Sequence, residues 1–153
     1  RKELNIKEHN DSTIKEDFFE FLEERDYSLS YKMPFLLAIV KRIDSIGDAK
    51  IEEVLDDYIA FYQDRLSRGL QVDRSTCPYD EKMLKDRKAV QRNMLTNPFE
   101  KFERKRFLYY SKDLSVISMN HALFEKMKEE DWERVRRQMR EDLRKYYDGM
   151  GGV

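Results

Sequence analysis

The apolar side chains in the first half of the chain recur every three or four residues, which is the spacing of one face of an α-helix. One such stripe consists of Met33, Leu36, Leu37, Val40 and Ile43. A second consists of Val54, Leu55, Tyr58, Ile59, Tyr62 and Leu66. Gly47 and Gly69 follow the stripes, where glycine commonly ends a helix. We therefore predict two core helices, over 30–46 and 52–68, with Ser30 as the N-cap of the first.

The composition also favours helices. The 153 residues include only five Gly and three Pro, too few for a protein built on tight β-turns, and 40% are charged, so the exposed faces are strongly solvated. Cys77 is the single cysteine, which excludes an internal disulfide and predicts a reducing, cytoplasmic setting. The longest apolar run, 33–40, is too short to span a bilayer, and the first residues do not form a signal peptide. We expect no membrane partner.

The remaining pattern predicts more helices and one β-hairpin. Helices are predicted over 13–24, 80–96, 97–106, 122–128 and 131–147. Residues 48–51 form an extended link, and the β-prone runs 107–110 and 114–119 are joined by Ser111, Lys112 and Asp113.

The order of these elements is helix, extended link, helix, loop, helix and hairpin, which is the order of a winged helix-turn-helix. We predict a mainly α fold with a winged-helix core over 30–121, a helical lead-in over 1–29, a helical extension over 122–148 and a flexible tail over 149–153. In a winged helix the third helix enters the major groove and the hairpin contacts the DNA beside it.

Positive charge is concentrated where that fold would need it. The whole chain has a net charge of −1, but residues 82–106 contain nine Lys and Arg against three Asp and Glu. This segment therefore carries +6, which leaves −7 for the rest. Binding to phosphates depends on such local neutralisation rather than on total charge.

Spacing assigns roles to individual residues. Lys85, Lys88 and Arg92 share one face of the predicted helix 80–96, and Gln91 beside them is of a type that reads adenine in the major groove. Further phosphate contacts are expected from Arg87, Lys101, Arg104, Lys105 and Lys112. The alternative interpretation is a solvated surface, because charged helix faces are common and a winged helix also mediates protein contacts.

No pattern of catalytic residues is present. His9, His121 and Cys77 are not spaced as a metal site, and no glycine-rich phosphate loop occurs. We expect neither enzymatic activity nor a cofactor or metal in this chain.

Five segments also resemble the accessory, C-terminal region of bacterial DEAD/DEAH-type superfamily-two helicases, some of which act in restriction or phage defence. These segments are 29–33, 80–88, 92–99, 102–110 and 117–120. The motor motifs of that family, a Walker A loop and an Asp-Glu box, are absent, so no catalytic residue carries over. The resemblance implies a role inside a larger ATP-dependent protein, with the motor domain of the same polypeptide as a partner.

These observations leave three hypotheses. The first is a nucleic-acid-binding accessory domain, with duplex DNA as the expected ligand. The second is a protein-interaction module whose terminal helices dock a motor domain or a second copy in a homodimer. The third is a free-standing regulator that binds two half-sites as a dimer. Because the chain starts at Arg1 without Met and ends in a glycine-rich run, we expect an excised domain rather than a processed subunit.

Overall fold

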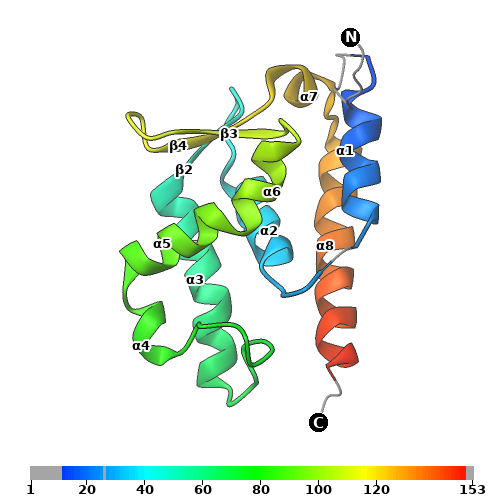
Figure 1. Cartoon of the computed structure of the whole chain (residues 1–153). Helices are drawn as coiled ribbons and strands as arrows, with labels where there is room; N and C mark the ends of the chain where they lie inside the picture. Colours follow the sequence, from blue (N-terminus) through cyan, green and yellow to red (C-terminus); the bar gives the residue numbers. More distant parts are fainter. Residues whose placement is uncertain (1–11, 26, 151–153) are drawn as a thin grey trace.

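The computed structural model describes residues 12–25 and 27–150 and shows a mainly helical chain with one small sheet (Figure 1). The elements are α1 (Ile14–Glu23), α2 (Lys32–Arg42), β2 (Asp48–Lys50), α3 (Ile51–Ser67), α4 (Glu81–Leu84), α5 (Arg87–Thr96), α6 (Pro98–Arg104), β3 (Leu108–Ser111), β4 (Val116–Met119), α7 (His121–Lys126) and α8 (Glu129–Gly149). The start of the predicted lead-in, with His9, and the end of the predicted tail lie outside the described residues.

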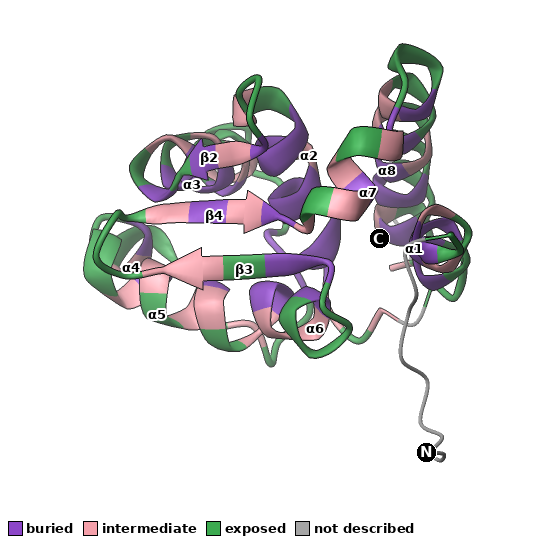
Figure 2. Ribbon diagram, turned by 90° about the horizontal axis from the view of Figure 1, so that it is seen from above, coloured by how far each residue is buried: buried purple, intermediate pink, exposed green. Residues whose placement is uncertain are grey.

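The three strands form an antiparallel sheet in the order β2–β4–β3. Ala49 of β2 and Tyr110 of β3 both pair with Ile117 of the central strand. The predicted hairpin is confirmed, and the predicted extended link is the third strand. Helices α3, α5 and α6 lie below the sheet in Figure 1, and Figure 2 shows the sheet lying over them.

Helices α1 and α8 run side by side and in the same direction along one flank of the molecule (Figures 1 and 2). Near their first turns Lys15 Nζ lies 3.0 Å from Asp131 Oδ2. Further along, Gln138 Nε2 donates to the carbonyl of Leu22 at 3.0 Å. Both terminal helices are therefore attached to the rest of the chain by specific contacts.

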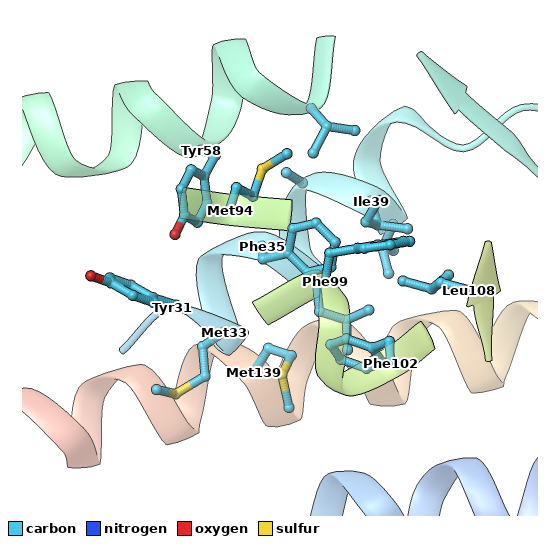
Figure 3. Packing of buried hydrophobic residues seen from close by; sticks show 14 of the residues in the cluster. Tyr31, Met33, Phe35, Ile39, Tyr58, Met94, Phe99, Phe102, Leu108 and Met139 are labelled. Atoms are coloured by element: carbon cyan, nitrogen blue, oxygen red, sulfur yellow. The ribbon is translucent and has the colours of Figure 1, made fainter. Parts of the chain in front are cut away.

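One hydrophobic core includes residues from every helix and every strand. At its centre Phe35 of α2 packs against Phe102 of α6, with ring centroids 5.9 Å apart, and Met94 and Met139 are fully buried beside them (Figure 3). Helix α1 reaches the same core through Phe18, whose ring packs on Phe107 at 5.2 Å. The apolar stripes of the terminal helices are thus covered within the chain.

Ser30 does not cap α2 as predicted. The N-cap of α2 is Tyr31, which forms no side-chain cap hydrogen bond, and the Ser30 hydroxyl instead bonds Asp73 and Tyr62. Burial explains the difference, because a fully buried hydroxyl takes the strongest acceptor that packing places beside it.

The predicted helix over 80–96 is also wrong in one respect, because it is interrupted at Lys85 and Asp86. The Asp80 carboxylate accepts the amide of Met83 at 2.8 Å, and the Asp86 carboxylate accepts the amide of Ala89 at 3.2 Å. Each aspartate is an N-cap, so two helices begin six residues apart. Helix α2 ends at Arg42, four residues before the predicted end, because the backbone is already extended at Ile43, so Gly47 does not end this helix as predicted. The remaining predicted helices are confirmed within two residues at each end.

None of the described helices combines the length and apolar character that a membrane span needs.

Candidate nucleic-acid interface

Helix α5 has one buried face and one exposed, polar face. Val90 and Met94 are fully buried, whereas Lys88 and Arg92 are exposed and Gln91 is half-buried. The positions 88, 91 and 92 share a face because they are separated by three and four residues. Within the described residues, neither Lys88 nor Arg92 forms an ion pair, so both charges remain available to a ligand.

Arg87, at the start of α5, forms ion pairs with two acidic side chains of α3. Its guanidinium lies 2.9 Å from the carboxylates of Glu52 and Asp56 and also bonds the Glu52 carbonyl at 3.0 Å. Two negative charges therefore surround this cation. Its contact is with α3, and it holds α5 against that helix.

Lys85 does not lie on the same stripe as Lys88 and Arg92, because it follows α4 in the turn before α5. Its Nζ lies 3.7 Å from Glu81, in a pair whose side chains are both largely exposed. Such surface pairs contribute only about 0–1 kcal/mol, so the lysine can exchange this partner for another anion.

Three of the expected phosphate contacts lie on α6 or directly after it rather than on α5. Arg104 is paired with Glu100 at 2.6 Å, and Lys105 follows the helix with its Nζ 5.9 Å from the Phe21 ring centroid. Lys101 is half-buried. In Figures 1 and 2 α6 lies between α5 and α1.

Lys112 lies in the turn of the β3–β4 hairpin and is exposed. Leu114 in the same turn is 72% exposed, and Ser115 adopts a left-handed φ of 56°. Both Figure 1 and Figure 2 show the hairpin turn and the start of α5 projecting on the same side of the molecule. Of the predicted residues, Lys85, Lys88, Gln91, Arg92 and Lys112 therefore belong to elements on one side.

A buried polar network was not anticipated from the sequence. Asp73, only 5% exposed, accepts hydrogen bonds from the backbone amide of Ser30 at 2.9 Å, from the Ser30 hydroxyl at 2.5 Å and from Tyr146 at 2.5 Å. Tyr147 donates to the carbonyl of Val72 at 2.7 Å. The loop that contains Asp73 is thereby attached to both α2 and α8.

The other end of the same loop is attached to α5. The Tyr79 hydroxyl donates to Asn93 Oδ1 at 2.7 Å and lies 2.8 Å from the hydroxyl of Tyr58 on α3. Burial raises the pKa of Tyr58 and Tyr79, so both phenols stay protonated well into the alkaline range. The network sets the position of α5 relative to α3. The only sequence signal for it was the concentration of tyrosines on the core stripes.

The described residues contain no group of three or more His, Cys, Asp or Glu side chains arranged to hold a metal ion. His121 is exposed and lies 3.0 Å from Glu125. Cys77 is half-buried, and its Sγ accepts a hydrogen bond from Tyr31 at 3.4 Å. Burial raises the pKa of the Cys77 thiol, which disfavours the reactive thiolate.

Comparison with protein-family models, with curated proteins and with solved structures finds no match to this chain.

Proposed function

We propose that this chain is a winged-helix domain that binds duplex DNA through α5 and the β3–β4 hairpin. Helices α2, α3 and α5 correspond to the three helices of that fold, and β2 corresponds to the strand that completes the sheet of the wing. The order of the elements and the strand order β2–β4–β3 support this assignment.

The exposed face of α5 carries the proposal. Lys88 and Arg92 supply unpaired positive charge, and Gln91 between them has the donor and acceptor needed to read a base edge. The helix is held from behind by Val90, Met94 and the Arg87 ion pairs, so this face is pre-organised. Lys112 on the hairpin would contact a phosphate beside the groove.

The domain would act as a non-catalytic accessory part of a larger cytoplasmic protein of the helicase or restriction type. The segments that resemble such helicases include 80–88 and 92–99, which contain most of α4 and α5. The reaction would then belong to the motor domain of the same polypeptide, and this domain would hold its DNA.

The protein-interaction alternative has less support. It needs free apolar surface on the terminal helices, but Val135, Met139 and Leu143 of α8 are buried within the chain. Among the described residues, the large apolar side chains that are exposed are Ile46, Leu70, Tyr109 and Leu114, which belong to separate segments.

Duplex binding at several salt concentrations tests the proposal. Fluorescence anisotropy with a labelled duplex of about 20 base pairs should show an affinity that falls steeply as NaCl rises. The Lys88→Ala/Arg92→Ala variant should weaken binding to every duplex, whereas Gln91→Ala should mainly alter the preference among sequences, by about 1–3 kcal/mol at one position.

The matched control is Arg137→Ala/Arg140→Ala, which removes the same formal charge from the exposed face of α8. If the Lys88/Arg92 variant binds as tightly as this control, α5 is not the contact surface. If the unaltered chain binds no duplex at low salt, the proposal fails as a whole.

A further inference from the structure

A shallow groove, open to solvent, lies where α4 meets α5. Its polar lining consists of Asp80, Lys82, Lys85, Asp86, Arg87 and Lys88. Lys82 is outside the set of residues that the sequence pattern assigned to nucleic acid, and it lies on α4 rather than on α5.

The two carboxylates of the groove are engaged by the backbone. Asp80 and Asp86 each accept a main-chain amide hydrogen bond as the N-cap of α4 and α5, respectively. Each cap hydrogen bond holds a carboxylate oxygen at the first turn of its own helix. Arg87 is likewise engaged, by the two acidic side chains of α3.

Three lysines supply the remaining charge of the groove. Lys82 and Lys88 are exposed and form no ion pair within the part of the chain that the structure describes. Lys85 has only the exposed contact of 3.7 Å with Glu81. An ammonium group acts as a mobile point charge that suits phosphate oxygens, and an open groove suits a continuous backbone better than an enclosed small molecule.

Lys88 belongs to both the groove and the exposed face of α5, so the two surfaces are continuous. From these observations we infer that the α4–α5 groove is a sequence-independent clamp for the backbone phosphates of the same duplex, with Lys82 and Lys85 as its contacts beyond α5. The inference rests on the proposed function and extends it. Side chains of α5 would contact the base edges, and Lys82 and Lys85 would fix the position of the DNA backbone along the domain.

The test uses the full chain and the variant Lys82→Gln/Lys85→Gln. Each lysine that neutralises a phosphate contributes about 0.9 to the slope of log affinity against log salt concentration, so the double variant should reduce that slope by about 2. Its affinity at 100 mM NaCl should fall by about tenfold on every duplex sequence tested, because phosphates carry no sequence information. The melting temperature should be unchanged, since both side chains are exposed.

Arg137→Gln/Arg140→Gln is the control of equal charge, on the exposed face of α8. If the Lys82/Lys85 variant and this control have the same salt slope as the unaltered chain, the groove does not bind the backbone. The proposed function would stand in that case, provided that the Lys88/Arg92 variant still loses affinity.

If the unaltered chain binds no duplex, titration with inorganic tripolyphosphate distinguishes failure of the groove inference from failure of the proposed function. Amide shifts confined to residues 80–88, and lost in Lys82→Gln/Lys85→Gln, would support a phosphate site in the groove while overturning the proposed function. The absence of such shifts would overturn both.

Discussion

Asp73 illustrates how one residue joins segments that are distant in the sequence. Its carboxylate is buried and accepts hydrogen bonds from the amide and hydroxyl of Ser30 and from Tyr146. Nothing in the local sequence around 73 distinguishes this position from an ordinary loop aspartate, because its partners lie 43 and 73 residues away. Sequence periodicity reports which face of a helix is buried, but it does not report which loop side chain reaches into that core.

Replacing Asp73 should therefore destabilise the fold strongly. Asp73→Ala leaves several buried donors without an acceptor, so we expect a loss of about 2–4 kcal/mol in the free energy of unfolding. Urea denaturation followed by circular dichroism measures this loss. Asp64→Ala is the control, since Asp64 forms only an exposed ion pair with Arg68. Equal urea midpoints for the two variants would show that the hydrogen bonds of Asp73 contribute nothing to the free energy of unfolding.

A second prediction concerns Tyr147 and the stability of the fold at alkaline pH. Burial is the main cause that raises the pKa of Tyr147, from 10.0 to about 12. The unfolded chain thus releases this proton at a lower pH than the folded chain. The stability that the phenol contributes is complete below pH 10 and is lost as the pH rises towards 12.

Tyr147→Phe should accordingly reduce the alkaline dependence of stability. Its free energy of unfolding should be lower than that of the unaltered chain at pH 8, because the hydrogen bond to Val72 is missing. The difference in free energy of unfolding between the two chains should narrow between pH 10 and 12, at up to about 1.4 kcal/mol per pH unit. Urea midpoints across this pH range measure this difference. A difference that stays constant would contradict the raised pKa of Tyr147.

At the scale of elements, the positions of most helices and of the hairpin follow from the sequence. The apolar stripes of α2 and α3 and the β-prone runs 107–110 and 114–119 are strong local signals. The interruption between α4 and α5 was missed because it contains neither Gly nor Pro and depends on Asp86 as an N-cap. The pairing of β2 with β4 was missed because a strand of three residues is defined by its partner rather than by its own pattern.

The same break changes the candidate site. A continuous helix would place Lys85 on the face of Lys88 and Arg92, whereas the turn moves Lys85 into the groove with Lys82. Arg87 was expected to meet phosphate and instead pairs with Glu52 and Asp56. The shared helix face that spacing predicted is kept only by Lys88, Gln91 and Arg92, because these three residues lie within the unbroken helix α5.

Helix α8 gives a prediction for a whole element. It buries Val135, Met139, Leu143 and Tyr146, and it packs along α2 and α1. A chain that ends at Met127 should therefore lose cooperative thermal unfolding, while a chain that ends at Met150 should keep it. Met139→Ala in the full chain, at a fully buried position, should cost about 2–4 kcal/mol. A cooperative melt of the chain that ends at Met127 would show that α8 is a dispensable extension.

At the scale of the whole molecule, charge is divided between regions rather than balanced locally. The net charge of −1 conceals the +6 of residues 82–106. Within that segment Arg87 is paired with Glu52 of α3, and Arg104 is paired with Glu100 of α6, so these two positive charges are offset by neighbouring carboxylates. Lys82 of α4 and Lys88 and Arg92 of α5 form no ion pair within the described residues, and Lys112 lies on the hairpin at the same side of the molecule.

The most direct test of this account is to map the DNA-contacting surface on the intact chain. Titration of the isotope-labelled protein with a duplex of about 20 base pairs, followed by amide chemical shifts, reports every residue near the ligand. We predict shifts in α4, in α5 and in the hairpin turn 112–115, with none on the exposed face of α8. Shifts centred on α1 and α8, or no shifts at low salt, would contradict the assignment of α5 and the hairpin as a nucleic-acid interface.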